Sequence, residues 1–340
     1  MDIIIKSFNR PFYLDRCIAS ILENAKGDFN IIVLDDGTPS QYLEKIQNKY
    51  PSVSIVKSKQ YADKIKAIDS NIKDGKSIDG FTIPTQLWYE QVKNASDYVL
   101  VTEDDVWMIE PINFDNLIKD MQKNKIPLLK LGWLGNYADD QYCNVSNLGT
   151  LDAVIPKKLF TGNPFVMDLF MYNKYKFFTI LYKLGFADNN TKIKYWAINS
   201  ILMGLYQKDY WLQIWKDAQG KVDEKQQLRN AASWYHKNKK AIFARTKQEV
   251  LKTTFKSSAT GSYHEYGQNF DVNRMNFILN EAWYDGQFNP MENYPKDYSD
   301  DYIKSFLDQT NHPDAQYSEW KKWSEQFKTQ YRNLGAEVDN

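Results

Sequence analysis

The sequence has few cysteines: its 340 residues include two, Cys17 and Cys143. Two thiols far apart in the chain cannot form the disulfide framework that stabilises many secreted domains. No Cys-x-x-Cys pair or cysteine–histidine cluster indicates a zinc site. Because a reducing compartment is the default for such a chain, we expect a cytoplasmic protein.

An excess of charge of either sign is also missing. Lys and Arg together number 43, Asp and Glu together number 43, and the formal net charge is zero. A general nucleic-acid-binding protein needs a basic excess to neutralise phosphates, so we expect no nucleic-acid partner. A local basic pocket for one phosphorylated ligand remains compatible with this balance.

Long hydrophobic runs and glycine-rich loops are absent as well. The most apolar helical stretch, residues 165–186, is interrupted by Asp168, Lys174, Lys176 and Lys183, so it is not a membrane span. No GxGxxG or GxxxxGK[ST] motif follows a predicted strand. These absences argue against a dinucleotide-binding domain and against a P-loop.

What is present is a regular alternation in the first half of the chain. Apolar runs that favour strands alternate with amphipathic stretches that favour helices, which predicts an α/β fold with a doubly wound sheet. The expected strands are 2–8, 30–38, 52–58 and 98–102, and the expected helices are 11–25, 39–50, 61–72 and 85–95. The strand ends carry polar residues, which should converge on one crevice.

The second half is less regular. We expect strands at 127–133, 150–160 and 209–215, helices at 164–184 and 194–206, and mostly helical structure after residue 224. The last predicted helix has an aromatic stripe that either packs on its own domain or lies on a membrane surface.

Three adjacent acids raise a chemical question. In "SDYVLVTEDDVWM", a buried strand runs directly into Glu103, Asp104 and Asp105. Adjacent carboxylates repel one another, and at a strand end facing a crevice their oxygens suit a hard cation such as Mg²⁺ or Mn²⁺. The alternative is a solvated acidic turn.

A second polar strand end is "VLDDGT", with Asp35, Asp36 and Gly37. One aspartate can cap the turn while the other accepts hydrogen bonds from a ligand, and Gly37 permits a positive φ. The alternative is an ordinary turn, since such sequences are common.

These motifs and their order resemble the nucleotide-sugar-dependent glycosyltransferases of the GT-A fold, in particular the inverting family 2. The segments "IIIKSFNRPFYLDRCIASIL", "FNIIVLDDGT" and "DYVLVTEDDVWM" carry the resemblance, over about residues 1–135, with a Glu-Asp-Asp variant of the family's Asp-x-Asp motif. The resemblance implies a mostly parallel sheet flanked by helices: a nucleotide-sugar-binding half at 1–135, an acceptor-side half at 136–270 and a helical extension at 271–340.

The resemblance also implies roles for individual residues. Phe8 would pack near the nucleobase, Asp36 would recognise it, and Asp105 would bind the metal that bridges the diphosphate, with His264 as a second metal ligand. Further donor contacts are expected from Asn9, Arg10, Asp35, Lys64, Glu103 and Asp104. The expected cofactor is therefore Mn²⁺ or Mg²⁺.

The implied activity is transfer of a sugar from a nucleotide-diphospho-sugar, with UDP-sugars favoured, to a saccharide or lipid-linked saccharide. The expected setting is bacterial capsule or lipopolysaccharide synthesis, with peripheral association at the inner face of the membrane. An inverting enzyme needs a carboxylate base, for which Asp168 and Asp188 are the candidates. A retaining mechanism, a nucleotidyltransferase and a non-catalytic sugar- or nucleotide-sugar-binding module are the alternatives.

Overall fold

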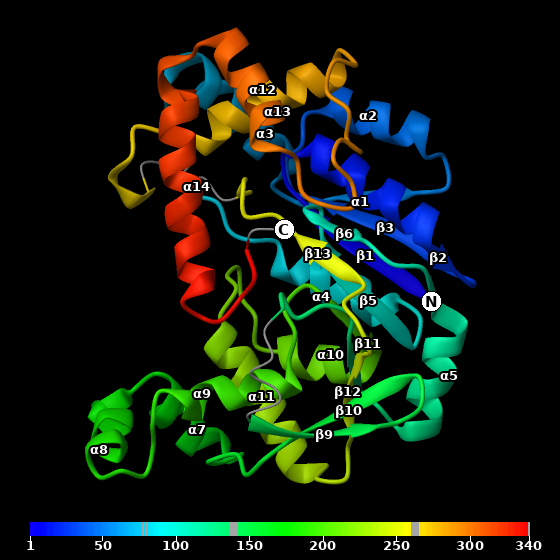
Figure 1. The fold of residues 1–340 in the computed structure, drawn as a ribbon, viewed down its shortest axis with the longest axis vertical. Coiled ribbons are helices and arrows are strands. Elements are labelled where there is room, and N and C mark those ends of the chain that lie inside the picture. Colours follow the sequence, from blue (N-terminus) through cyan, green and yellow to red (C-terminus); the bar gives the residue numbers. More distant parts are fainter. Residues whose placement is uncertain (77, 79, 136–141, 260–264, 339–340) are drawn as a thin grey trace.

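A nine-stranded sheet forms the centre of the molecule (Figure 1). This computed structural model describes residues 1–76, 78, 80–135, 142–259 and 265–338. In spatial order the strands are β4 (Ser54–Lys57), β3 (Asn30–Asp35), β1 (Asp2–Ser7), β5 (Tyr98–Glu103), β11 (Gly204–Gln207), β8 (Leu128–Lys130), β12 (Phe243–Thr246), β10 (Leu151–Pro156) and β9 (Cys143–Asn147). Two small ribbons pair β13 (Leu251–Thr253) with β6 (Val106–Met108) and β2 (Ala25–Lys26) with β7 (Ile112–Asn113).

The first half of the chain forms the parallel part of the sheet. Strands β4, β3, β1 and β5 are parallel neighbours, and their register places Ser7 opposite Asp35 and Lys6 opposite Glu103. The carboxyl ends of these strands therefore meet at one edge, as the sequence predicted. The chain continues from β1 to β3 on one side of β1, and β5 lies on the other side, so the strand order reverses at β1. Open α/β sheets bind ligands at such a reversal.

The second half makes the sheet mixed. Four of the eight strand pairings in the sheet are parallel and four are antiparallel, and every antiparallel pair contains at least one strand that follows residue 135. The α/β class is confirmed, and so is a central sheet flanked by helices.

Thirteen α-helices of the described residues surround the sheet. They are α1 (Pro11–Asn24), α2 (Ser40–Lys49), α3 (Tyr61–Asp74), α4 (Thr85–Asn94), α5 (Phe114–Asn124), α7 (Pro164–Met171), α8 (Phe177–Lys183), α9 (Asn190–Ile193), α10 (Lys208–Trp215), α11 (Glu224–Lys237), α12 (Val272–Tyr284), α13 (Asp300–Thr310) and α14 (Tyr317–Arg332). Short 3₁₀ helices lie at Lys174–Lys176, Lys194–Ile198, Glu265–Gly267 and Pro313–Ala315.

The two faces of the sheet bury two separate hydrophobic cores. Along β1, Ile3 and Ile5 point into one core and Ile4 points into the other, as the alternation of a strand requires. The first core is covered by α1, α2 and the carboxyl-terminal helices, and the second by α4, α7, α10 and α11. A strand covered on both faces must be apolar throughout, which explains the Ile3-Ile4-Ile5 run.

Two predicted elements were wrong. Residues 209–215 form helix α10 and not a strand, because Tyr210, Trp211, Ile214 and Trp215 recur at a helical spacing and bury one face. The predicted helix 194–206 is instead the 3₁₀ helix Lys194–Ile198 followed by strand β11. Backbone pairing with β5 and β8 on both sides decides the conformation of β11, and local sequence does not reveal that pairing.

The carboxyl-terminal helices pack back onto the first half of the chain. The Asn280 side chain on α12 donates to the main-chain oxygen of Asn9, and the Arg16 guanidinium on α1 donates to the carbonyl oxygens of Pro290 and Glu292. On α14, Trp320 is fully buried, so the aromatic stripe packs on its own domain. Within the described residues, no helix combines the length and apolarity that crossing a bilayer requires.

Candidate active site

The three acids that follow β5 are each close to a basic side chain. Lys6 on β1 donates to the Glu103 carboxylate at 2.6 Å, and Arg10, just before α1, forms ion pairs with Asp104 and, at 2.9 Å, with Asp105. Asp104 also accepts a hydrogen bond from the main-chain N–H of Phe8 at 3.1 Å. With all three carboxylates ionised, two cations face three negative charges, which leaves one negative charge uncompensated.

Burial dominates the protonation behaviour of this cluster. Burial raises the pKa of Asp104 to about 7, although Arg10 opposes the shift, and the neighbouring Asp105 adds to it. Burial likewise raises the pKa of Asp105, again against Arg10. For Glu103, burial acts upward, but the charge and hydrogen bond of Lys6 outweigh it and lower the pKa. Glu103 is thus the most readily ionised of the three acids.

At the end of β3, the two adjacent aspartates Asp35 and Asp36 make different contacts. Asp35 Oδ1 accepts from the main-chain N–H groups of Gly37 and Thr38, at 3.0 and 2.8 Å, so Asp35 shapes the turn. Asp36 does not cap the turn; it forms a buried ion pair with Lys64 of α3. Burial raises the pKa of Asp36, and the hydrogen bond from Lys64 opposes that shift.

Phe8, Asp36 and Lys64 gather around Gly37. A Cβ atom on Gly37 would lie 2.9 Å from Cβ of Lys64 and 3.0 Å from a ring carbon of Phe8, and the φ of Gly37 is +147°. Lys64 Nζ lies 5.8 Å from the Phe8 ring centroid and also donates to the carbonyl oxygen of Thr82 at 2.9 Å. Glycine is therefore required both by the backbone conformation and by the close approach of these side chains.

A cavity of about 330 Å³ lies beside the acid cluster. Its lining combines charged groups, hydroxyls and aromatic rings, and includes Arg10, Glu103, Asp105, Ser257, Ser258 and Tyr331. Arg10 supplies a cation and Ser258 supplies a hydroxyl, which suits an anionic ligand such as a phosphate, whereas the Ser257 hydroxyl already donates to Asn276 Oδ1 at 2.8 Å. This cavity brings Arg10, Glu103 and Asp105 together, as the sequence predicted.

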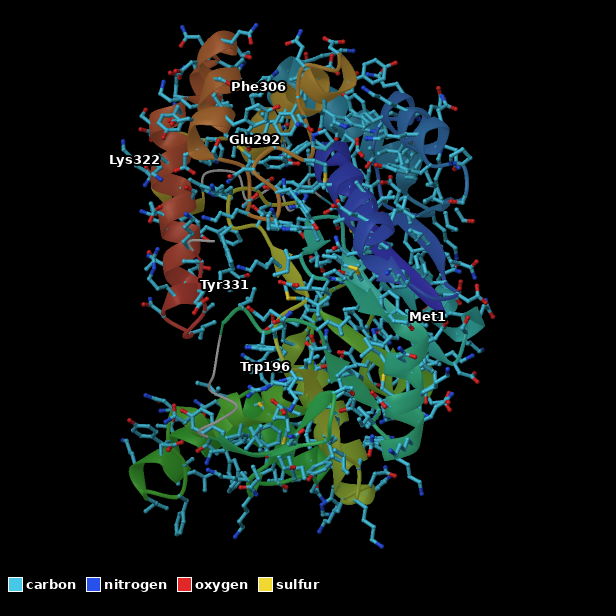
Figure 2. All side chains as sticks on the ribbon, turned by 45° about the vertical axis from the view of Figure 1, so that its right-hand side comes forward. Met1, Trp196, Glu292, Phe306, Lys322 and Tyr331 are labelled. Carbon is cyan, nitrogen blue, oxygen red and sulfur yellow. The ribbon has the colours of Figure 1, made fainter. Side chains whose placement is uncertain are left out.

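A second cavity of about 300 Å³ adjoins the first. Leu134, Leu202 and Tyr331 line both cavities and form the wall between them, and Trp196 and Glu224 line the second cavity alone. Tyr331 lies near the carboxyl end of α14, and Trp196 lies in the part of the molecule below it in the view of Figure 2. Burial raises the pKa of Tyr331 to about 12, and the negative charges of Glu224 and Asp105 contribute.

Glu224 was missed by the sequence analysis. It stands in the first turn of α11, directly after Asp223, whose side chain caps the helix by accepting from the N–H of Gln226 at 3.1 Å. Glu224 is exposed to solvent in the cavity that it lines, and desolvation by nearby protein atoms, followed by the charge of Asp223, raises its pKa. The available signal was an Asp-Glu pair that opens a helix, which sequence reasoning treats as ordinary capping.

Asp168 and Asp188, the predicted catalytic carboxylates, do not line either cavity. Asp168 on α7 forms an ion pair with Arg229 at 3.0 Å. Asp188 lies in an exposed turn and accepts from the Thr191 hydroxyl at 2.6 Å, and this hydrogen bond lowers the pKa of Asp188. His264, the predicted metal ligand, lies outside the described residues.

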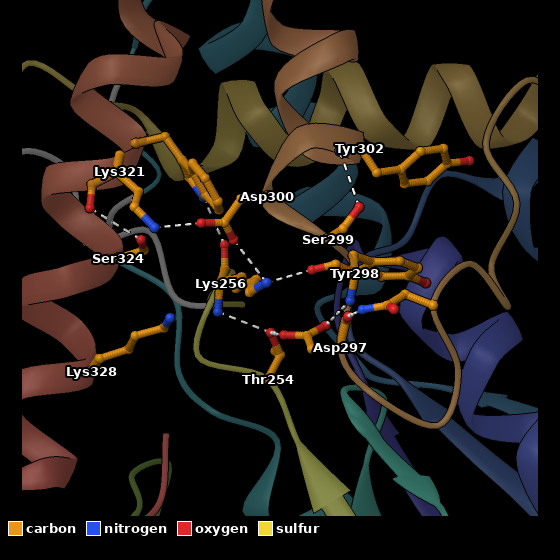
Figure 3. A network of polar contacts seen from close by, with 12 residues as sticks. Thr254, Lys256, Asp297, Tyr298, Ser299, Asp300, Tyr302, Lys321, Ser324 and Lys328 are labelled. Atoms are coloured by element: carbon orange, nitrogen blue, oxygen red, sulfur yellow. Dashed lines mark hydrogen bonds and ion pairs between the residues drawn. The ribbon is translucent and has the colours of Figure 1, made fainter. Parts of the chain in front are cut away.

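The wall of the first cavity is fixed to the carboxyl-terminal helices by a polar network (Figure 3). Asp297 accepts from the Thr254 hydroxyl at 2.6 Å, and Lys256 forms an ion pair with Asp300 at 2.9 Å. Lys321 of α14 pairs with the same Asp300 carboxylate, so two lysines share it. This network holds the segment 253–258, which supplies both serines of the cavity.

The oxygen ligands expected for a divalent cation are present only in part. Asp105 Oδ1 is buried without a hydrogen-bond partner, and Glu103 and Asp105 line the same cavity. No group of three or more His, Cys, Asp or Glu side chains suited to a metal occurs among the described residues. These side chains fit an ion such as Mg²⁺, which takes one or two protein carboxylates and completes its coordination with phosphates and water.

Comparison with known proteins gives one family match and several distant structural similarities. No curated protein matches the chain. The chain is similar to TarS 1–349 of S. aureus in complex with UDP-GlcNAc, at 13% identity over 90% of this chain and 71% of that one, with a TM-score of 0.42. It is also similar to the galactosyltransferase LgtC in complex with donor and acceptor sugar analogs, at 13% identity over 68% of this chain and 70% of that one, with a TM-score of 0.33.

The mannosyltransferase PcManGT from Pyrobaculum calidifontis, in complex with GDP-Man and Mn²⁺, is similar at 12% identity over 38% of this chain and 34% of that one, with a TM-score of 0.28. Because all three TM-scores lie below 0.5, these similarities carry no conclusion about substrate or metal. The sequence match is more direct, since residues 2–76 match the family model described as glycosyl transferase family 2. Over residues 2–76 the chain is therefore similar to glycosyl transferase family 2, and this match confirms the resemblance predicted from the motifs of that segment.

Proposed function

We propose that the protein transfers a sugar from a nucleotide-diphospho-sugar, with UDP-sugars favoured, to a hydroxyl group of a glycan acceptor. The observation that carries this proposal is the pair of adjoining cavities. One contains a guanidinium, two carboxylates and two serine hydroxyls, and the other contains the carboxylate of Glu224. Leu134, Leu202 and Tyr331 separate them, so a donor in the first and an acceptor in the second would meet at this wall.

The nucleotide part of the donor would occupy the edge of the sheet between β1 and β3. Phe8 supplies an aromatic ring for the base, and Asp36 supplies a carboxylate that can accept hydrogen bonds from it. Lys64 holds Asp36 in place through the buried ion pair. The diphosphate would then lie in the first cavity, where Arg10 and the hydroxyl of Ser258 can donate to its oxygens.

Asp105, with Glu103, would hold a Mg²⁺ or Mn²⁺ ion there. When bound, such an ion supplies Lewis-acid stabilisation of the charge that develops on the departing diphosphate. His264 remains the predicted further ligand. The ion pairs with Arg10 orient Asp104 and Asp105 and oppose the protonation that burial favours.

Glu224 is the general base in this proposal, in preference to Asp168 and Asp188. The acceptor oxygen forms a bond to the anomeric carbon while the bond from that carbon to the phosphate oxygen breaks. The electron pair of the broken bond leaves with the nucleoside diphosphate, and the proton of the acceptor hydroxyl passes to Glu224. A raised pKa suits a carboxylate for this task, because a general base works best when its pKa approaches the working pH.

We further propose that the acceptor is a bacterial surface glycan, free or lipid-linked, and that the reaction takes place in the cytoplasm or at the inner face of the membrane. The scarcity of cysteine supports the reducing compartment. The family resemblance supports the kind of acceptor.

Calorimetric titration with UDP and with GDP tests the donor site, with and without Mn²⁺, on the wild type and on Asp105→Ala. We expect UDP to bind in the presence of Mn²⁺, and the loss of either the ion or the Asp105 carboxylate to weaken binding about tenfold or more. Binding that depends on neither would show that the acids form only a turn.

Transfer to an acceptor tests Glu224. We expect Glu224→Gln to keep nucleotide binding and to lose transfer by roughly 100-fold or more. Asp209→Asn is the matched control, because Asp209 is an exposed acid in the first turn of another helix, α10. Full transfer activity in the Glu224→Gln variant would exclude Glu224 as the base. If the wild-type protein hydrolysed the donor but transferred sugar to no glycan, the acceptor would be of another class.

A further inference from the structure

The segment from α7 to α8 exposes an unusual amount of apolar surface. Six of the eleven exposed large hydrophobic side chains of the described residues lie between positions 165 and 186. They are Phe165, Tyr175, Ile180, Tyr182, Leu184 and Phe186, with exposed fractions from 49% to 90%. Single exposed apolar residues are normal on a protein surface, but such a concentration marks an interaction surface.

This apolar surface lies at one corner of the molecule. Helices α7 and α8 form the lower left corner of the molecule in Figure 1, far from α12 and α13. Their inner side is anchored: Met167 and Phe170 of α7 are buried in the second core, and Phe178 of α8 stacks edge-on against Phe170. The exposed side chains are therefore presented from a packed base and are not part of an unfolded segment.

The turn between the two helices presents the most exposed of these side chains. Asn173, Tyr175 and Lys176 all adopt positive φ, at 51°, 52° and 58°, which is costly for residues other than glycine. Asn173 stabilises the turn by accepting from the N–H of Thr179 at 3.1 Å. The result is that the Tyr175 side chain, which is 90% exposed, stands at the tip.

The charges around the surface are basic. Lys174, Lys176 and Lys183 alternate with the exposed apolar residues in the sequence, and the acid of the segment, Asp168, is already paired with Arg229 of α11. Three lysines thus stand among aromatic and aliphatic side chains without a compensating free acid in residues 164–186. Aromatic and leucine side chains beside lysines are the composition of surfaces that lie in the interface of an anionic bilayer.

We propose that residues 164–186 are a membrane-docking surface that binds anionic lipid headgroups through its lysines and inserts its apolar side chains at the headgroup level. The lysines favour this partner over a second copy of the same surface, because pairing two such surfaces would bring like charges together. Helix α14 is not part of this docking surface, because its aromatic stripe is buried within the domain.

The position of the surface connects it to the second cavity. Helix α9 and the 3₁₀ helix Lys194–Ile198 follow α8 in the chain, and Ile193, Lys194 and Trp196 line that cavity. Docking through α7 and α8 would hold the second cavity close to the membrane surface. The docking proposal itself does not depend on the proposed transferase activity.

Co-sedimentation with vesicles tests the proposal directly. Vesicles of equal parts phosphatidylglycerol and phosphatidylcholine are compared with vesicles of phosphatidylcholine alone, each at low and at high salt. We expect the wild-type protein to bind the anionic vesicles, to bind the neutral ones far less, and to be released by salt. Equal binding to both vesicles, or none to either, would overturn the proposal.

Two sets of variants separate the apolar and the charged contributions. The first, Tyr175→Ser with Leu184→Ser and Phe186→Ser, removes apolar side chains, with Leu22→Ser on α1 as the matched exposed control. The second, Lys176→Glu with Lys183→Glu, reverses charge on solvated side chains, with Lys66→Glu on α3 as its control. We expect each set to weaken vesicle binding by roughly tenfold or more, and the controls to bind like the wild type.

Size-exclusion chromatography of the same proteins completes the test. Wild type, serine variant and glutamate variant should elute as the same species, with unchanged circular dichroism. If the wild type were a dimer that the serine variant dissolves, the surface would be a contact between copies and the membrane proposal would fail. Vesicle binding by the glutamate variant equal to that of the wild type would also contradict it.

Discussion

At the scale of single residues, the geometry of the candidate site depends on Gly37, where a side chain would collide with its neighbours. Gly37 combines a φ of +147° with close approaches to Lys64 and Phe8. The same residue therefore controls the path of the turn after β3, the position of Phe8, which we assign to the nucleobase, and the position of Lys64, which holds Asp36.

We expect Gly37→Ala to lower the free energy of unfolding by about 1–3 kcal/mol and to weaken UDP binding, because the new Cβ displaces Phe8 or Lys64. Gly149→Ala is the matched control, since Gly149 also has a positive φ, +86°, but has no atom within 4 Å of the added Cβ. Chemical denaturation and calorimetry measure the two effects. Equal losses in both variants would show that backbone strain, and not contact, is responsible.

The pH dependence of transfer is the second expectation at this scale. The base must be ionised to accept a proton, and the pKa of Glu224 lies above that of an ordinary glutamate. The rate should therefore fall, as the pH is lowered, at a higher pH than an unperturbed glutamate would give. Rates of transfer under donor saturation, measured across the acidic range, check this. A rate that stays constant through that range would exclude Glu224 as the titrating group.

At the scale of elements, the first cavity depends on the connection between segment 253–258 and α13 and α14. Asp300, in the first turn of α13, receives Lys256 from that segment and Lys321 from α14. Burial acts to raise the pKa of Asp300, but hydrogen bonds from the two lysines outweigh it and lower the pKa below its ordinary value.

We expect Asp300→Asn to lower the free energy of unfolding by about 1 kcal/mol at neutral pH, because the carboxylate is partly solvated and solvent screens its pairs. Since the folded pKa is the lower one, this stabilisation is present above the unfolded pKa of aspartate and is lost as the pH falls through the folded pKa. Denaturation curves of the two proteins should converge at the acidic end. Asp301→Asn, at the exposed neighbouring position, should show neither the loss nor the convergence.

Sequence patterns predicted the strands that are buried on both faces better than the elements whose conformation depends on distant parts of the chain. Strands β1 and β5 are buried on both faces, so their Ile, Val and Leu runs indicate them without further context. Helix α10 was taken for a strand because its Tyr and Trp residues favour strands, while its helical spacing extends over only two turns. Strand β11 depends on pairing with β5 and β8, which are distant in the sequence and leave no local pattern.

The same reasoning explains which site residues were predicted. Arg10, Glu103 and Asp105 follow parallel strands, and strand order alone brings such positions to one edge. Glu224 lies on a helix of the second half, and it reaches its cavity only because α11 packs beside the 3₁₀ helix Lys194–Ile198. No periodicity in the sequence encodes that packing.

At the scale of the whole molecule, α14 closes the arrangement. The last helix crosses from the carboxyl-terminal layer to the two cavities and places Tyr331 in the wall between them. Helix α14 thus completes a site whose charged groups come from distant parts of the chain, Arg10, Glu103, Asp105 and Glu224.

We expect Tyr331→Ala to join the two cavities, so that water reaches the donor; donor hydrolysis should rise relative to sugar transfer. Tyr331→Phe keeps the ring and should preserve the ratio of transfer to hydrolysis. Chromatographic measurement of released sugar and of glycosylated product gives both rates. An unchanged ratio in the alanine variant would show that the ring does not separate the two cavities.

A wall shared by two cavities also links what happens on its two sides. Any ligand that shifts Leu134, Leu202 or Tyr331 from one cavity changes the shape of the other, and such an influence must be reciprocal at equilibrium. A donor that strengthens acceptor binding by some factor is itself bound more strongly by the same factor once the acceptor is present. The two substrates would then act as effectors of one another, and three shared side chains would transmit the coupling.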